Sequence, residues 1–491
     1  MAKSLSERSL SAIVWVLLDK AGSSSVNFVV TIILARLLSP EDFGLVAMVM
    51  VFFEFSSVFV ESGFSTALIR EKTISEIDKS TTFIFNFAAA LVFYAVLFFS
   101  APAIAAFFNQ ESLVWIVRIM GLNLIFSSFS IIQHSMLVQQ IDFKNQTKVR
   151  FFTVIISGTA AILLALNGYG VWSLVVRFGL TDLMDTVLLW ILRPWKPTAR
   201  FSTESFRRLF GFGSRILAAA VLDKFFVHIY KLLIGKFFAA ATLGFYTQAN
   251  NFTNMVINTL FRTVNNVTYP VLAKLQDDHE KLKEGYRKIL KLSSFIVVPA
   301  MVMLGVLAEP IILVLVGEKW RPSIPMLQLL CVSGLTYHFS SINLNMLLVL
   351  GRSDLSLKLE VIKKINIALA IVIGIQFGIY GLIIGEVISC YVNLFVNAYY
   401  SNKLLKYSIR EQIRDIFPTV SISLLSGLAL LLINRNTTFS GFVDILLIAP
   451  ASVLLYLAVH ILTKTDEMTL LRQTIIPKTM QLFTKTKSAH K

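Results

Sequence analysis

Charge and cysteine are both scarce in this chain. Only 15% of its 491 residues are charged, whereas soluble domains carry about 25%. Hydrophobic residues make up 56%, and the mean hydropathy is +0.72. This balance excludes an ordinary soluble protein, because lipid must surround most of such a chain. Cys331 and Cys390 are the two cysteines, and each lies in an apolar run. A disulfide framework and a cysteine-based metal site are therefore excluded as well.

The common catalytic motifs are also absent. Gly235-Lys236 is followed by Phe237, so there is no Gly-x-x-x-x-Gly-Lys-Ser/Thr phosphate loop. No His-Glu-x-x-His, Cys-x-x-Cys or Gly-x-Ser-x-Gly occurs either. We therefore expect no enzyme, no catalytic residue, no metal and no bound cofactor. The energy is expected to come from a gradient of H+ or Na+, or from use of the product on the far side.

Long apolar runs recur along the whole chain. A helix needs about 20 apolar residues to cross the hydrocarbon. Runs of that length predict an all-α polytopic membrane protein with about fourteen transmembrane helices. The predicted spans are 12–37, 43–64, 82–108, 113–137, 149–167, 170–192, 209–235, 243–268, 292–316, 325–350, 362–378, 380–400, 415–433 and 442–463.

Lysine and arginine are distributed unevenly between the predicted loops. With the N-terminus placed in the cytoplasm, 33 of the 45 fall in cytoplasmic segments. This asymmetry predicts a multi-pass inner (plasma) membrane protein with both termini in the cytoplasm. The net charge of +16 then mostly reflects this topology, together with some attraction to anionic lipid headgroups. We therefore expect no nucleic acid partner. The five lysine and arginine residues predicted on the outer side are Arg36, Lys236, Lys319, Arg321 and Arg435.

The two halves of the sequence contain similar segments in the same order. The segment Leu34–Gly44 parallels Ile234–Gly244 at an offset of 200, and Tyr169-Gly170 parallels Tyr380-Gly381 at an offset of 211. Both halves begin on the cytoplasmic side and contain six spans, so the predicted repeat is parallel. Such a repeat is typical of carriers that rock between two states. The predicted domains are a six-helix bundle over 1–200, a second over 201–405, and two extra helices with a cytoplasmic tail over 406–491.

Seven lysine and arginine residues lie inside the predicted spans, away from the span ends. Each costs about 2.5–3.5 kcal/mol at mid-bilayer if it faces lipid. Lys224, His228 and Lys231 of the seventh span are spaced i, i+4, i+7, which places them on one helix face. The set predicts a site for phosphate or pyrophosphate, although its members could also snorkel or pair with nearby acids. The seven are Lys20, Arg118, Arg177, Arg215, Lys224, Lys231 and Arg262.

Amide side chains form a second stripe, on the eighth span. Together with Arg262 they recur at steps of three and four residues, which describes one continuous polar helix face. Amides both donate and accept hydrogen bonds, which suits sugar hydroxyls. The alternative is that they bond neighbouring helices, but so long a stripe favours a water-filled channel. Together with two residues of the tenth span, the predicted glycan contacts are Gln248, Asn251, Asn254, Asn258, Asn265, Tyr337 and Asn343.

Five acidic residues of the spans could have either of two roles. They either carry a coupling ion or neutralise the basic set, and neutralisation is slightly favoured for the second span. The histidines near the spans are more often structural than proton relays. The five acids are Asp19, Glu54, Glu61, Asp182 and Asp223.

Several segments carry a family resemblance. They are residues 35–44, 210–213, 269–278, 317–320 and 327–330. In this order they resemble the polysaccharide-transporter (Wzx-type) flippases of the multidrug/oligosaccharidyl-lipid/polysaccharide superfamily, and most of all the branch of colanic-acid and teichuronic-acid exporters. The resemblance covers roughly residues 10–400.

The resemblance implies a function. It implies that an undecaprenyl-pyrophosphate-linked repeat unit is flipped from the cytoplasmic to the periplasmic leaflet for exopolysaccharide, capsule or O-antigen. It also implies membrane lipids, a polysaccharide polymerase and a chain-length regulator as partners.

Three other functions stay open at this point. A cation-coupled drug antiporter of the same superfamily would favour an interior dominated by acids. A membrane polysaccharide polymerase or ligase would need a sizeable outer loop, whereas the predicted outer loops at 109–112 and 167–170 are very short. A structural member of an export complex would transport nothing itself.

Overall fold

The computed structural model describes residues 22–470 apart from 62, 72, 73, 199, 437–446 and 448. The described chain is helical and contains no β-strand. Its helices are a first one at Gly22–Leu37, then α2 (Pro40–Glu61), α3 (Phe64–Arg70), α4 (Glu76–Phe108), α5 (Leu113–Gln139), α6 (Phe143–Leu166), α7 (Val171–Leu192), α8 (Thr203–Phe237), α9 (Ala240–Ala273), α10 (His279–Val306), α11 (Ala308–Leu315), η1 (Glu318–Trp320), α12 (Ser323–Gly334), α13 (Tyr337–Val349), α14 (Ser353–Gly374), η2 (Ile375–Phe377), α15 (Gly378–Leu405), α16 (Ile409–Asn436), α18 (Ala449–Leu462) and α19 (Asp466–Leu470).

The all-α membrane architecture predicted from the sequence is confirmed. Seven helical stretches of the described chain are long and apolar enough to cross a bilayer, and the protein is an integral membrane protein. Every predicted span falls at least partly on a helix. The span over 325–350 is divided into α12 and α13, and the ends of 12–37 and 442–463 lie outside the described residues. The count of fourteen crossings stays a prediction.

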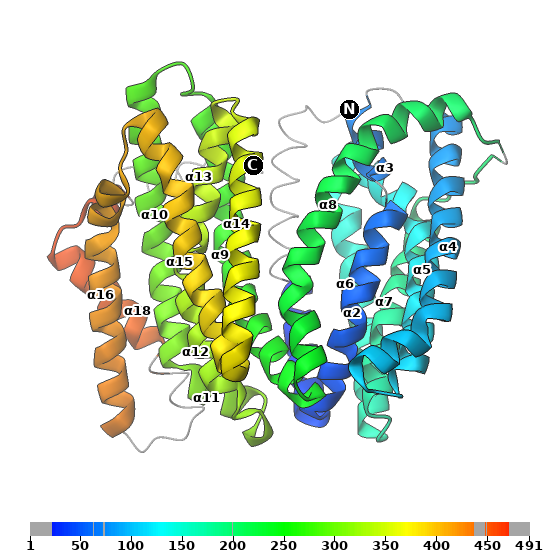
Figure 1. Ribbon diagram of the computed structural model, residues 1–491, viewed down its shortest axis with the longest axis horizontal. Helices are drawn as coiled ribbons and strands as arrows, with labels where there is room; N and C mark the ends of the chain where they lie inside the picture. The colour runs from blue at the N-terminus through cyan, green and yellow to red at the C-terminus, as the bar shows by residue number, and fades with distance from the viewer. Residues whose placement is uncertain are drawn as a thin grey trace, which may run out of the picture. The chain divides into compact units, whose positions relative to one another are not determined.

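The helices pack into two compact units, Met1–Thr247 and Gln248–Lys491. In the first, α4 pairs with α5 and α6 with α7, while α8 lies along α2, α3 and α4. In the second, α14 pairs with α15, and α10 packs on α16. Within each unit the long helices run side by side (Figure 1). The predicted domains, with six-helix bundles over 1–200 and 201–405, remain a prediction.

The repeated segments meet in a reciprocal contact inside the first unit. A Cβ on Gly44 of α2 would lie 1.8 Å from the carbonyl oxygen of Ala240, and a Cβ on Gly244 of α9 would lie 1.8 Å from that of Pro40. These positions are equivalent at the offset of 200. The starts of α2 and α9 therefore cross backbone to backbone, which only residues without a side chain permit.

Side-chain caps begin several helices. Ser75 and Asp78 form a reciprocal capping box at α4, and the side chains of Asp142, Ser202 and Asp278 accept backbone hydrogen bonds at α6, α8 and α10. Each cap satisfies a backbone N–H that the first helical turn leaves without a partner. This is why α4 begins at Glu76, before its apolar run.

The connection from α7 to α8 is held against the first turns of α4. Ser80 and Thr81 of α4 are fully buried, and Asp78 is 3% exposed. Hydrogen bonds of 2.5–3.0 Å run from Trp195 to Glu76, Thr198 to Ser80, Ser202 to Thr81 and Arg208 to Asp78. The start of α8 is thereby fixed to the first unit.

A charged network lies at one end of the second unit. Asp415 of α16 is 6% exposed. It accepts hydrogen bonds from Arg287 of α10 and from the Tyr407 hydroxyl, the latter at 2.6 Å. Lys291 of α10, 3.9 Å from Asp415, donates to Asp466 of α19 at 2.7 Å, and this hydrogen bond holds the pKa of Asp466 below its usual range. The network joins three helices.

Replacing Asp415 by alanine is expected to lower the free energy of unfolding of the second unit by about 2–3 kcal/mol. Breaking a fully buried pair costs about 3–5 kcal/mol, and the loss is smaller here because the Arg287 side chain is half exposed. Thermal unfolding in detergent measures the effect. Asp354→Ala, which removes a surface pair with Arg352, is the control and should leave Tm unchanged. Equal Tm values for both variants would contradict the role given to Asp415.

Candidate functional site

A cationic face of α8 forms one side of the candidate site. Lys224, His228 and Lys231 follow each other at one-turn intervals along this helix. The Lys224 ammonium donates to the Glu54 carboxylate of α2 at 2.5 Å. Both side chains are partly exposed, at 38% and 31%. Lys224 is therefore neutralised by an ion pair that is not sealed in a close-packed interior.

His228 and Lys231 lack such a partner in the part of the chain that the structure describes. Both ring nitrogens of His228 are buried without a hydrogen bond there, and the Lys231 ammonium makes no hydrogen bond or ion pair with a described residue. Both side chains lie within electrostatic range of Glu54 and Lys224. A cation at this depth of a helix bundle without its own counter-ion favours an anionic ligand.

Acidic side chains face this region from α2 and α7. Asp185 of α7 is 2.6 Å from the Nε2 atom of His134 on α5. Asp182, one turn earlier, lies within electrostatic range of Asp185 and Glu54. Glu61, at the end of α2, is within range of Lys224, Glu54 and His134. We call this set the charged cluster; it consists of Glu54, Glu61, His134, Asp182, Asp185, Lys224, His228 and Lys231.

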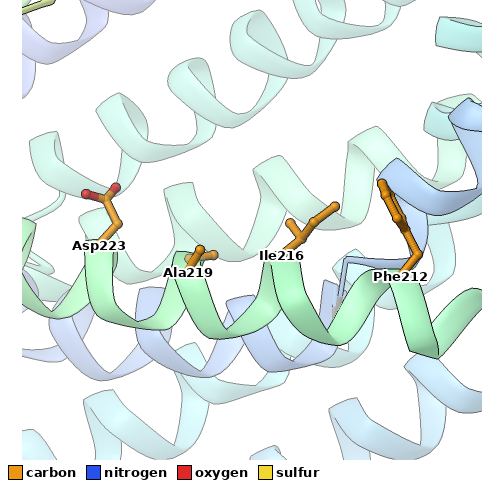
Figure 2. Close-up of a pocket in the computed structure, with 5 residues that line it drawn as sticks. Phe212, Ile216, Ala219 and Asp223 are labelled. Atoms are coloured by element: carbon orange, nitrogen blue, oxygen red, sulfur yellow. The ribbon is translucent and has the colours of Figure 1, made fainter. Parts of the chain in front are cut away.

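A cavity of about 540 Å³ opens along α8 next to the charged cluster. Its described lining consists of Phe212, Ile216, Ala219, Ala220 and Asp223, all from α8. Figure 2 shows the Asp223 carboxylate and the Phe212 ring at opposite ends of this row. The lining is apolar except for Asp223, which directly precedes Lys224 in the chain. The cavity thus suits an amphipathic ligand.

Of the other predicted phosphate residues, Arg118 and Arg177 are not part of the charged cluster. Arg118 stacks over the rings of Phe98 and Trp115, at 4.4 and 5.3 Å. Arg177 donates to Asn27 and Thr31 of the first helix, at 2.7 and 3.1 Å. Their guanidinium groups are thus satisfied by aromatic faces and by polar groups. Asp19 and Lys20, and the side chains of Arg215 and Arg262, lie outside the described residues.

The predicted glycan contacts have different environments in the second unit. Asn251, Asn254 and Asn258 of α9 are exposed. Asn254 donates to Asn250 at 2.7 Å. These three amides form an accessible stripe. The side chain of Asn265 lies outside the described residues.

Two of the remaining three differ from the exposed stripe. Tyr337 is 49% exposed, whereas Gln248 is 2% and Asn343 is 1% exposed. Asn343 donates to the Phe339 carbonyl and accepts from Ser401 of α15. The Asn343 amide thus takes part in packing, with one hydrogen bond inside α13 and one across to α15.

Sequence reasoning did not single out the His134–Asp185 pair. Periodicity places residues on a helix face, but it does not tell which faces of α5 and α7 meet. The signal that could have found it is Asp182 and Asp185 together in a single predicted span, since intramembrane acids seldom occur without a partner.

Comparison with protein families gives a match over more than half of the chain. The profile of the family described as "Polysaccharide biosynthesis protein" matches residues 33–325. Curated relatives include the teichuronic acid biosynthesis protein TuaB of Bacillus subtilis, 26% identical over 62% of this chain and 63% of that protein. The succinoglycan biosynthesis transport protein ExoT of Rhizobium meliloti is 26% identical over 65% of each chain. The lipopolysaccharide biosynthesis protein WzxC of Escherichia coli is 26% identical over 76% of each. The alignments thus span just under two thirds of the first two relatives.

Solved structures share the fold. The lipid II flippase MurJ in an inward closed conformation superposes with a TM-score of 0.75 at 16% identity, covering 93% of this chain and 99% of that one. An inward-facing multidrug resistance MATE family transporter of the MOP superfamily gives 0.62 at 16% identity, covering 81% and 99%. The predicted polytopic fold of this superfamily is therefore confirmed.

Proposed function

This chain belongs to the polysaccharide biosynthesis protein family, and on that premise we propose that it flips a lipid-linked oligosaccharide repeat unit across the inner membrane. The unit would be an undecaprenyl-pyrophosphate-linked oligosaccharide that passes from the cytoplasmic to the periplasmic leaflet and is used for a surface polysaccharide. The names of the teichuronic acid, succinoglycan and lipopolysaccharide relatives support this class of substrate.

The observation that carries the proposal is the charged cluster at membrane depth. A lipid-linked oligosaccharide has an apolar chain that can stay in the bilayer, a diphosphate and a polar glycan. Lys224, His228 and Lys231 offer donors to the diphosphate. The exposed amides of α9 offer donors and acceptors to the glycan. No covalent bond has to change, so transport needs positioning and charge compensation only.

The proposed transport mechanism is alternating access. Alternating access between two six-helix bundles would carry the unit across, with both termini in the cytoplasm. Glu54, Glu61, Asp182 and Asp223 are the acids through which a flux of H+ or Na+ would be coupled. A polysaccharide polymerase and a chain-length regulator are the proposed protein partners.

Deleting the gene tests the function. The expected result is that lipid-linked repeat units accumulate on the cytoplasmic face, where added glycan-modifying enzymes cannot reach them from outside intact cells. Mass analysis of the accumulated lipid identifies the repeat unit. Unchanged polysaccharide export with no accumulation would exclude the proposal, and loss of cationic drug efflux alone would favour an antiporter. Flipping by purified protein in vesicles separates a transporter from a structural member of an export complex.

A further inference from the structure

The two lysines of the charged cluster are not equivalent. Lys224 holds the Glu54 carboxylate at 2.5 Å, while Lys231, seven residues further along α8, makes no hydrogen bond or ion pair with a described residue. His228 lies between them, with two buried ring nitrogens that have no described partner. The Lys224 ammonium is therefore paired with an internal carboxylate, whereas His228 and Lys231 have no described partner.

The exposure of the ion pair shows that it can be opened. Glu54 and Lys224 retain 31% and 38% of their side-chain exposure, so an entering anion can reach the Lys224 ammonium without unpacking the helices. The Glu54 carboxylate differs in this respect from that of Asp415, which is 5% exposed. The site therefore resembles a ligand-binding position in which the Glu54 carboxylate competes for Lys224. It resembles less an ion pair that only stabilises the fold.

We infer that Glu54 is an exchangeable counter-ion, so that a diphosphate first binds Lys231 and His228 and then takes Lys224 from Glu54. This inference rests on the proposed function and names the order in which the substrate's diphosphate is recognised. Seven helical residues separate the two lysines by about 10 Å along the axis. Their long side chains can converge on a group that carries several acceptor oxygens.

The surroundings of Glu54 explain why the exchange reverses. A displaced Glu54 carboxylate faces Glu61 on its own helix and Asp182 on α7, and both acids lie within electrostatic range of it. Asp185 and His134 are paired with each other. Like charges disfavour the displaced position, so Glu54 is drawn back to Lys224. A carrier must release its cargo, and this returning carboxylate limits how tightly the diphosphate is held.

Binding of farnesyl pyrophosphate to the purified full-length protein in detergent tests the inference. Farnesol provides the control for the isoprenyl chain. Glu54→Gln is expected to bind about tenfold more tightly than the unmodified protein, because Lys224 then has no competing carboxylate. Lys231→Met is expected to bind about tenfold more weakly. Glu309→Gln, which removes an exposed carboxylate paired with Arg321, is the matched control and should not change the affinity.

A double-mutant cycle separates exchange from general repulsion. In a Lys224→Met background, Glu54→Gln should change the affinity by less than about twofold, since there is no lysine left to free. An equal gain in both backgrounds would overturn the inference, as would an unchanged or weaker affinity of a Glu54→Gln variant that keeps its Tm. Displacement of farnesyl pyrophosphate by excess phosphatidylglycerol would identify a phospholipid headgroup site instead.

The two proposals can fail separately. Diphosphate binding with the predicted cycle, but without accumulation of lipid-linked units in the deletion strain, would overturn the flippase function and leave the exchange standing. Accumulation in the deletion strain, together with an unchanged affinity of the Glu54→Gln variant for farnesyl pyrophosphate, would overturn the exchange and leave the flippase function standing.

Discussion

Replacing Lys224 and Lys231 together by methionine is expected to abolish export while the protein still inserts and folds. Hydrogen bonds to a charged group contribute about 1.5–3 kcal/mol each, so losing two costs at least about 100-fold in affinity for the diphosphate. Methionine keeps the length and the apolar contacts of lysine. The measurement is surface polysaccharide per cell in a deletion strain that expresses each variant, normalised to the amount of protein in the membrane.

Two further variants make this result specific. The double variant leaves Glu54 without its partner, so a triple variant that adds Glu54→Gln removes the unpaired carboxylate and should still fail to export. Lys236→Met removes a lysine of the same helix that donates to the Phe107 carbonyl at 2.6 Å, and should export within about twofold of the unmodified protein because this lysine lies outside the charged cluster. Full export by the double variant would refute the diphosphate site.

Alanine at Gly44 or Gly244 is expected to have the largest effect on folding. A methyl group at either position would lie 1.8 Å from a backbone carbonyl oxygen, and a helix backbone cannot rotate away as a side chain can. The starts of α2 and α9 would have to separate. Overpacking of this kind costs about 3 kcal/mol or more, so little monodisperse protein should be recovered in detergent, as size-exclusion chromatography would show.

Gly211→Ala is the matched control for these variants. Gly211 lies in α8 and has no atom within 4 Å of an added Cβ. Alanine there should leave recovery unchanged or improve it, because glycine inside a helix is less favourable by about 0.5–1 kcal/mol. Since Gly44 and Gly244 form the two sides of one crossing, the double variant should cost less than the sum of the single variants. Normal recovery of Gly44→Ala would show that the crossing adapts.

Local patterns anticipated much of the fold and part of the site. Runs of apolar residues predicted the spans because the bilayer thickness sets the length of a crossing helix. The helical repeat placed Lys224, His228 and Lys231 on one face. Periodicity could not distinguish Asn254, which is exposed, from Asn343, which is buried, because accessibility depends on the neighbouring helix.

The sequence by itself determined that this protein is helical and lies in the membrane, since hydrophobicity and helical periodicity are properties of a single segment. It also predicted which charges lie at membrane depth. Only the tertiary structure decided that Glu54 pairs with Lys224, that Asp185 lies beside His134, and that Gly44 packs against α9. Each of these contacts joins helices far apart in the chain, and the helix faces that pack together are selected by the fit of many side chains at once.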